Sequence, residues 1–137
     1  VGEGIFICEN RHSLSDSELA LVENIFSKIA LMQFVDTNQL SIAGTVSGCG
    51  PAFASMFLEA LADAAVMHGL TRDTAYSLAA QMIAGTGKLQ LKTGAHPGAM
   101  KDAVCSPGGT TIRGVAALER GGLRAAVINA VDAAEYC

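Results

Sequence analysis

The sequence predicts a mainly helical protein in which a set of helices follows a short strand-helix-strand unit. Half of the 137 residues are apolar but only 5% are aromatic, so the interior must be built from Ala, Leu, Ile, Val and Met, which suits closely packed helices. Helical periodicity dominates the later part of the chain, whereas strand-like apolar runs are confined to the first part. We therefore expect two segments, residues 1–35 and residues 36–137.

The first segment has the pattern of a strand, a helix and a second strand. Residues 4–8 and residues 31–35 are short apolar runs of the kind found in buried strands. Between them, Ser15 and Glu18 have the spacing of a capping box, which predicts a helix start there, and apolar residues at helical spacing continue to about Ala30. Such a unit is too small to form a stable sheet alone, so we expect it to close a larger α/β sheet.

The second segment has the pattern of helices separated by glycine and proline. Pro51 is expected at the first position of a helix that runs to His68, where Gly69 would end it in a left-handed conformation. The same reasoning predicts four more helices, from Arg72 to about Lys92, from Pro97 to about Val104, from Thr110 or Thr111 to Arg120, and from the residue after Gly122 to about Tyr136.

Several of these helices are apolar around most of their circumference. A helix of this kind must be enclosed on every side, and a bundle of about 100 residues cannot easily enclose more than one. The helix predicted after Arg72 also carries small residues that let another helix approach closely, namely Ala79, Ala80, Ala84, Gly85 and Gly87. A second copy of the chain would solve the burial problem, so we expect an obligate, intertwined homodimer with a large apolar interface.

Charge and hydropathy argue against two classes of partner. The formal net charge is -4 and no cluster of Lys and Arg is present, so we expect no binding to nucleic acid. No residue between Asp36 and Glu59 is charged, and that run is long enough to span a bilayer. The sequence from Ser47 to Pro51 would break such a helix in the middle of the lipid, so we expect a buried helix in a soluble protein and no membrane partner.

Cysteine and histidine usage indicates a reduced protein without a metal centre. Cys8, Cys49, Cys105 and Cys137 are scattered, with no C-x-x-C spacing and no signal peptide ahead of them, which favours a cytoplasmic location. The three histidines share no metal-ligand spacing with the cysteines or with one another. We therefore expect no metal site.

The sequence Gly48-Cys49-Gly50 begins like a dinucleotide-binding fingerprint. Phe53, however, stands where the third Gly or Ala is needed, and no strand precedes the motif. We interpret these residues as a tight turn between two packed helices, and we expect no cofactor-binding site within this chain.

Residues 105–111, Cys-Ser-Pro-Gly-Gly-Thr-Thr, form the stretch that is best suited to bind a ligand. Gly108 and Gly109 expose backbone amides where a helix begins, and the positive end of that helix favours a carboxylate or phosphate. The hydroxyls of Ser106, Thr110 and Thr111 can add directional hydrogen bonds. An ordinary loop whose Thr caps the helix explains the same residues, and the motif alone favours that simpler interpretation.

The sequence from Ser106 to Arg124 closely resembles the signature of pyrroline-5-carboxylate reductases. The residues that carry this resemblance are Ser106-Pro107-Gly108-Gly109-Thr110-Thr111-Ile112, Gly114, Val115, Leu118, Glu119 and Gly121-Gly122-Leu123-Arg124. Earlier stretches agree as well, namely Val1-Gly2-Glu3-Gly4, Ser47-Gly48-Cys49-Gly50-Pro51-Ala52, Glu59-Ala60-Leu61-Ala62-Asp63, Gly69-Leu70, Ala80-Gln81, Gly85, Lys88 and His96-Pro97. The resemblance thus covers essentially the whole chain.

The resemblance implies an oxidoreductase of proline biosynthesis, an amino-acid biosynthetic route, in which NADPH or NADH reduces 1-pyrroline-5-carboxylate to L-proline. Such enzymes have an amino-terminal Rossmann domain and a carboxy-terminal helical domain that interlocks two subunits, which often assemble further into rings. Residues 1–35 would be the last part of the Rossmann domain and residues 36–137 the dimerisation and substrate-binding domain. Most of the cofactor site would then lie outside this chain, and the chain alone would be inactive.

The resemblance also assigns roles to the loop. Ser106, Gly108, Gly109 and Thr110 would bind the substrate carboxylate, and the hydroxyl of Thr111 would hydrogen-bond the ring nitrogen as it becomes an amine. These roles agree with the anion site inferred from the glycines and the helix start, and they reverse the preference for an ordinary loop.

Two positions depart from the pattern of the family. Cys49 stands where Ser is common, and Thr37 stands where an acidic residue near the substrate is often found, which leaves the role of the Asp36-Thr37 turn open. Two alternatives also stay open, namely a non-catalytic helical dimerisation module and a reductase that acts on a different cyclic imine or on a hydroxy acid.

Overall fold

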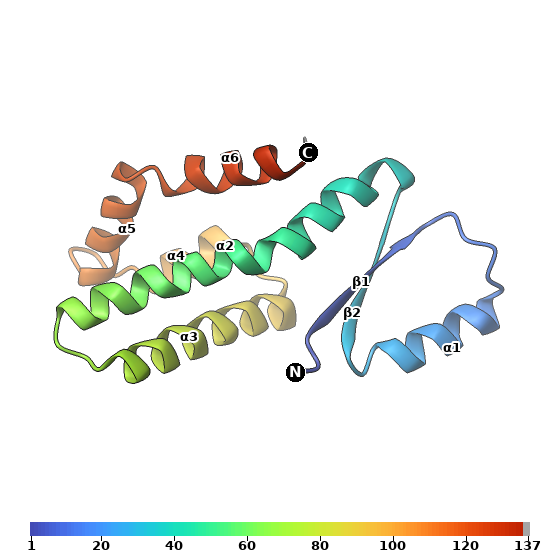
Figure 1. Ribbon diagram of the computed structural model, residues 1–137, viewed down its shortest axis with the longest axis horizontal. Coiled ribbons are helices and arrows are strands. Elements are labelled where there is room, and N and C mark those ends of the chain that lie inside the picture. The colour runs from blue at the N-terminus through green and yellow to red at the C-terminus, as the bar shows by residue number, and fades with distance from the viewer. Residues whose placement is uncertain (136–137) are drawn as a thin grey trace. The chain divides into compact units, whose positions relative to one another are not determined.

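The computed structural model describes residues 1–135 and confirms a mainly helical fold preceded by a strand-helix-strand unit (Figure 1). The chain forms two compact units, one made of residues 1–51 with the end of the last helix and the other made of residues 52–129. The elements follow one another in the order β1 (Gly4–Glu9), α1 (Asp16–Phe26), β2 (Ala30–Val35), the 3-10 turn η1 (Thr37–Gln39), α2 (Leu40–Met67), α3 (Arg72–Thr93), α4 (Pro97–Ala103), α5 (Thr110–Arg120) and α6 (Leu123–Glu135).

The two strands form a parallel sheet in which the first residue of β1 pairs with the first of β2, and so on to the last. A parallel pair requires a crossover, and α1 provides it. The ring centroids of Phe6 on β1 and Phe26 on α1 lie 4.5 Å apart, so aromatic contact holds the helix to the sheet. As predicted, α1 begins with a capping box, in which the Ser15 amide donates to the Glu18 carboxylate at 2.8 Å and the Glu18 amide donates to the Ser15 hydroxyl at 3.4 Å.

The first helix is shorter than the apolar periodicity predicts. It ends at Phe26, and the amide of Ile29 donates to the Phe26 carbonyl at 3.0 Å in a tighter turn. Ala30, which we expected near the end of the helix, is instead the first residue of β2, where it pairs with Gly4. Ala30 therefore pairs within the sheet although its spacing also fits a helix.

The prediction that a helix begins at Pro51 is wrong, because Pro51 lies in the interior of α2. The helix is started earlier by the segment Asp36–Gln39, where the Asp36 amide donates to the Gln39 side chain at 3.1 Å and the Gln39 amide donates to the Asp36 carbonyl at 2.8 Å. These contacts form the turn η1, which leads directly into α2. Consequently, Gly48 to Pro51 is not a turn between two helices.

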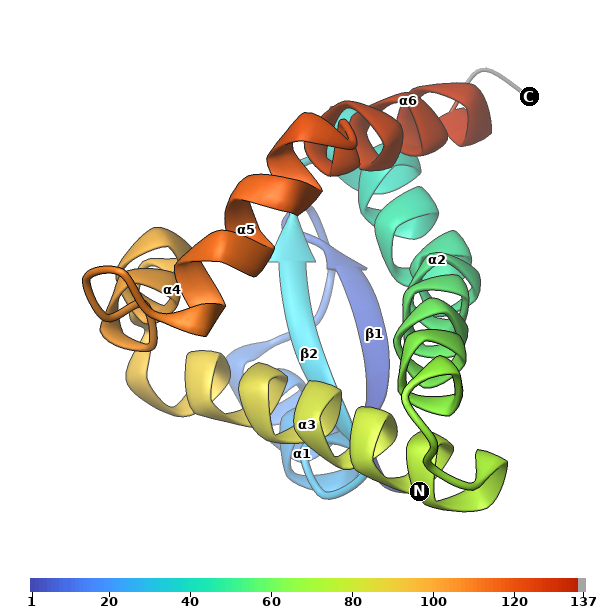
Figure 2. The ribbon, with the colours of Figure 1, turned by 90° about the vertical axis from the view of Figure 1, so that its left-hand side faces the viewer.

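The remaining helices begin and end close to their predicted bounds. Gly94 ends α3 with φ 63°, a left-handed conformation that favours glycine. Pro97 opens α4, and the Nδ1 atom of His96 accepts a hydrogen bond from the Gly98 amide at 3.0 Å. Figure 2 shows α5 leading from the short α4 to the start of α6. The predicted end of the last helix, Tyr136, lies outside the part of the chain that the structure describes.

Few side chains of residues 1–135 are buried within the single chain. The buried apolar residues are all alanines, namely Ala30, Ala62, Ala75 and Ala79. The chain exposes 10040 Å², whereas a compact monomer of its mass would expose about 6,700 Å² and two separate compact units of half that mass about 8,100 Å² together. The excess means that much apolar surface is left uncovered by the chain itself.

The long apolar helix illustrates this uncovered surface. The segment Thr37–Met67 has a mean hydropathy of 1.3 over its most apolar part, so length and composition alone would allow it to cross a membrane. Only 6% of that part is buried within the chain, so the expectation of a buried helix is not met by one chain alone. The core helix of a soluble protein passes the same length and composition test, so the test by itself indicates little.

Candidate functional site

The loop between α4 and α5 is a tight turn built by proline and glycine. The Gly109 amide donates to the Ser106 carbonyl at 3.0 Å, which closes a four-residue β-turn from Ser106 to Gly109. Pro107 holds the second position, and Gly108 holds the third with φ 69°. A positive φ at the third position defines a type II turn, for which this order of residues is the preferred one.

A side chain at position 109 would displace the Ser106 hydroxyl from its place in this turn. A Cβ atom built there would lie 2.4 Å from the Ser106 hydroxyl oxygen and 3.1 Å from the Ser106 carbonyl oxygen. The Ser106 side chain therefore rests against the Gly109 backbone. The Gly109 amide is used inside the turn, so it is not free to bind a ligand as we expected from the sequence, and Gly109 contributes shape instead.

The helix start that follows has no side-chain cap. The N-cap residue of α5 is Gly109, which has extended backbone angles and makes no capping hydrogen bond, and Thr110 is the first helical residue. The ordinary-loop interpretation required a threonine cap, which the structure does not show. The amides of Thr110, Thr111 and Ile112 therefore form the positive end of α5, and no side chain caps them.

The hydroxyls predicted to bind a ligand lie around this helix start. Ser106, Thr110 and Thr111 are all exposed, and within residues 1–135 the hydroxyls of Thr110 and Thr111 make no hydrogen bond. Uncapped amides, the positive end of a helix and free hydroxyls together make a set of donors for a small anion.

A second polar cluster lies where the two parallel strands end. The Thr37 hydroxyl donates to the Glu9 carboxylate, and the Asn10 side chain donates to the Asp36 carboxylate at 2.8 Å. These contacts tie the Asp36-Thr37 turn to the end of β1. The acidic group that position 37 lacks is thus present beside it, on Glu9.

The Gly48-Cys49-Gly50 motif does not fit the pyrophosphate of a nicotinamide nucleotide. Gly48 and Gly50 lie inside α2, where helical hydrogen bonds use the backbone amides that a pyrophosphate would need. Cys49 is half-buried in the same helix. Across residues 1–135, no group of three His, Cys, Asp or Glu side chains is placed to hold a metal ion.

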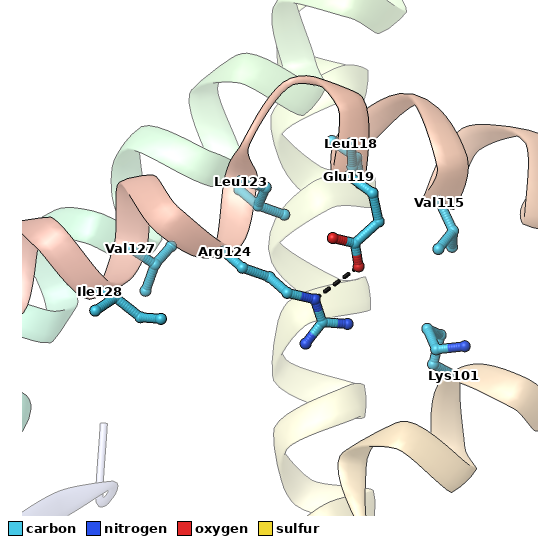
Figure 3. A pocket seen from close by; sticks show the side chains of 8 residues that line it. All are labelled: Lys101, Val115, Leu118, Glu119, Leu123, Arg124, Val127 and Ile128. Carbon is cyan, nitrogen blue, oxygen red and sulfur yellow. Dashed lines mark hydrogen bonds and ion pairs between the residues drawn. The ribbon is translucent and has the colours of Figure 1, made fainter.

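A groove of about 540 Å³ is formed by residues of α4, α5 and α6, the helices that precede and follow the loop (Figure 3). The sequence did not predict this groove, because its residues come from three helices. We call it the α5–α6 groove, and it is lined by Lys101, Val115, Leu118, Glu119, Leu123, Arg124, Val127 and Ile128. The Nε atom of Arg124 lies 2.6 Å from a Glu119 carboxylate oxygen. Lys101 pairs with Asp102, and the hydrogen bond to this carboxylate raises the pKa of Lys101.

Comparison with known proteins identifies the family. Residues 37–136 match the family model described as pyrroline-5-carboxylate reductase dimerisation. The chain is 53% identical over 134 residues to a pyrroline-5-carboxylate reductase of Treponema pallidum, a match that covers 98% of this chain and 51% of the relative. It is 48% identical over 118 residues to the Escherichia coli enzyme of that name, a match that covers 86% of this chain and 44% of the relative.

Solved structures agree with the sequence comparison. A pyrroline-5-carboxylate reductase of Coxiella burnetii superposes with a TM-score of 0.89 at 32% identity, covering 98% of this chain and 50% of that one. A Plasmodium falciparum pyrroline carboxylate reductase with NADP bound gives a TM-score of 0.82 at 34% identity, covering 98% of this chain and 54% of that one. The chain spans about half the length of the relatives that it matches, and it belongs to the pyrroline-5-carboxylate reductase family.

Proposed function

We propose that this chain is the substrate-binding and self-associating part of a cytoplasmic reductase that converts 1-pyrroline-5-carboxylate to L-proline with NADPH or NADH. Membership of the family supports this proposal. The observation that carries it is the uncapped start of α5, where free amides and hydroxyls surround a type II turn whose positive φ favours glycine at position 108 and whose Ser106 hydroxyl lies against glycine at position 109.

In this proposal the substrate carboxylate accepts hydrogen bonds from the first amides of α5 and from the hydroxyls of Ser106 and Thr110. Gly108 and Gly109 keep the turn small enough for the carboxylate to approach. Thr111, one residue further into the helix, hydrogen-bonds the ring nitrogen as it changes from imine to amine. Because the C=N carbon is already electrophilic, these residues act by holding it in position.

The nicotinamide nucleotide would supply the hydride in this reaction, and the Gly48-Cys49-Gly50 motif, which lies inside α2, does not fit its pyrophosphate. We therefore place its site in a part of the protein other than this chain, and we expect the chain alone to be catalytically inactive. The relative from Plasmodium falciparum has NADP bound, which supports a nicotinamide nucleotide as the donor. The choice between NADPH and NADH rests on residues outside this chain.

The uncovered apolar surface supports self-association. A standard interface buries about 800 Å² on each partner, and the chain exposes far more than that beyond the needs of compact units. We propose a homodimer in which each chain covers the apolar helices of the other. The same surfaces would allow dimers to assemble further into rings.

A binding experiment separates the proposed function from its alternatives. L-proline, added at millimolar concentration to the chain labelled with ¹⁵N, should shift the amide resonances of Gly108 to Ile112. Thr111→Ala should weaken the binding of L-proline but not that of cyclopentanecarboxylate, which has the carboxylate and lacks the ring nitrogen. Thr93→Ala, whose hydroxyl bonds to the Leu89 carbonyl within α3, serves as the matched control.

The outcomes distinguish three functions. A non-catalytic dimerisation module would show no shifts at the loop with either compound. A reductase of hydroxy acids would bind a compound such as L-lactate in preference to L-proline. Shifts confined to other parts of the chain would contradict the proposed site.

A further inference from the structure

The short helix α4 leads directly into the Ser106–Thr111 loop, and both belong to the same compact unit, residues 52–129. It has seven residues, and a helix of that length is not stable in water without support from its ends or its surroundings. After it, the Cys105 amide donates to the Asp102 carbonyl at 3.0 Å, immediately before the turn of the loop. The end of α4 therefore determines where the loop begins.

A histidine caps the start of α4. The Nδ1 atom of His96 accepts a hydrogen bond from the Gly98 amide at 3.0 Å, and the Met100 amide donates to the His96 carbonyl at 3.1 Å. A Cβ atom at position 98 would lie 3.0 Å from Nδ1 and 3.2 Å from Cε1 of the ring. The imidazole therefore lies directly against the Gly98 backbone, and the glycine leaves room for it.

This cap exists only while the imidazole is neutral. Because an amide can only donate, Nδ1 must be the nitrogen without a proton, and the ring proton is on Nε2. A protonated imidazole has donors at both nitrogens and no acceptor, and its charge is unfavourable at the positive end of a helix. Histidine is the side chain that changes its charge between about pH 5 and 8, whereas the residues preferred at an N-cap, Ser, Thr, Asp and Asn, do not. The cap is therefore lost as pH falls through this range.

The charged side chains of the neighbouring elements do not pair with this ring. They are Lys88 and Lys92, toward the end of α3, and Lys101 and Asp102 on α4 itself. Lys101 and Asp102 pair with each other. Among residues 1–135, the bond to the start of α4 is the one hydrogen bond of the His96 side chain. Protonation of the ring is therefore opposed by the cap and is favoured by no ion pair within the described residues.

We propose that His96 is a positioning residue whose protonation loosens α4 and the loop, so that the chain binds the substrate carboxylate more weakly once the imidazole is charged. The inference rests on the proposed carboxylate site and adds a pH-dependent control of that site. His96 does not touch the substrate in this arrangement, and it acts through the backbone from Gly98 to Ser106. A loop that is ordered beforehand loses less conformational freedom on binding, so loss of the cap lowers the affinity.

Titration with L-proline at several pH values tests the inference, because proline keeps its charges over the range in which histidine titrates, about pH 5 to 8. In the chain labelled with ¹⁵N, the dissociation constant should rise about fivefold as pH falls through this range, the effect expected for one helix cap. The midpoint of this rise should coincide with the midpoint of the shifts of the His96 ring resonances.

Two matched variants locate the effect. His96→Asn keeps an acceptor that does not titrate, so its dissociation constant should stay low across the whole range. His68→Asn, the same change at another exposed histidine, should keep the pH dependence of the original chain.

Each result supports or overturns the inference. Affinity that does not change with pH in the original chain, or that changes equally in His96→Asn, overturns the inference and leaves the proposed function standing. Absence of binding at every pH overturns both. A purely structural cap would lower the free energy of unfolding at low pH without changing the affinity for L-proline, and this result would also overturn the inference. His96→Ala should bind weakly at every pH, and if circular dichroism shows that it is unfolded, the comparison of the original chain with His96→Asn decides.

Discussion

At the scale of single residues, the two glycines of the loop have different roles. Gly108 has a backbone conformation with φ 69°, which other residues adopt only at a cost of about 1 kcal/mol. Gly109 has ordinary backbone angles, but a side chain there would overlap the Ser106 hydroxyl in its present position. One glycine is needed for its conformation and the other for its small size, so the shape of the turn depends on both.

Gly109→Ala is expected to weaken binding of L-proline while the helices stay folded. The added methyl group would overlap the Ser106 hydroxyl, which must turn away from the helix start, and it would crowd the Ser106 carbonyl at 3.1 Å. Gly121→Ala is the control, because a Cβ there would lie 3.5 Å from its nearest neighbours, an ordinary contact. Titration with L-proline followed by NMR measures both variants, and binding retained in Gly109→Ala would contradict the proposed geometry.

Thr111→Ala is expected to lower turnover of pyrroline-5-carboxylate at least tenfold, which corresponds to roughly the loss of one hydrogen bond in the transition state. The measurement uses a polypeptide that joins this chain to a nucleotide-binding half. The KM for NADPH should not change, because Thr111 does not contact the nucleotide in our proposal. Thr111→Ser keeps the hydroxyl and should restore most of the rate. Steady-state kinetics provides the test, and an unchanged rate in Thr111→Ala would remove the assigned role.

At the scale of helices and strands, a helix start could be predicted from the sequence where its contacts join residues close together in the chain. The capping box of Ser15 and Glu18 was predictable because its contacts span three residues. The segment Asp36–Gln39 carries the same kind of signal, an acidic residue followed three positions later by Gln, and it would have located the start of α2. Pro51 was misleading, because a proline costs a helix interior about 3 kcal/mol without necessarily ending the helix.

The features of the candidate site also fall into those that the sequence could predict and those that it could not. The turn from Ser106 to Gly109 follows from residue types that prefer defined backbone angles, so the sequence was enough to predict a tight loop before a helix. The use of the Gly109 amide inside that turn was not predictable, since it depends on which carbonyl the amide meets. The α5–α6 groove needs three helices in place, and no local pattern reveals it.

The contact between the end of α6 and the start of α2 should make stability depend on pH. Hydrogen bonds from Thr45, at 2.6 Å, and from Ser41 hold the pKa of Glu135 below its ordinary value. A lowered folded pKa means that the contribution is fully present above the unfolded value and is lost as pH falls through the folded one.

Urea unfolding between about pH 7 and about pH 3 measures this effect. The original chain should lose more stability over this range than Glu135→Gln, which has no carboxylate to protonate. Glu23→Gln, at an exposed position of α1, provides a control for the general effect of removing one acidic group. Equal losses in the original chain and in Glu135→Gln would contradict the role of this contact.

At the scale of the whole molecule, the single chain lacks a core of its own. Its buried apolar residues, among residues 1–135, are four alanines. Large side chains such as Met56, Leu78, Val127 and Ile128 remain exposed. The sequence predicted this shortage, because helices that are apolar all round need more neighbours than one small bundle contains. It did not predict which surfaces meet, since that depends on how helices from two chains fit together.

The chain is therefore expected to be a dimer at micromolar concentration. Multi-angle light scattering should give twice the chain mass of 14.1 kDa. Fluorescence of a dye that binds exposed apolar surface should stay low in the dimer, because the partner covers the helices. A stable, folded monomer with low dye binding would contradict the burial argument.

The shortage of large buried side chains also affects how the chain acquires its structure. If most apolar contacts form between two copies, the helices cannot reach their final stability before the copies meet. Refolding should then include a bimolecular step whose rate rises with protein concentration, and dilution should shift the midpoint of thermal unfolding downward. The folding of a newly synthesised copy would depend on the local concentration of other copies. The fraction of the protein that reaches its native state in the cell would therefore rise with its level of expression.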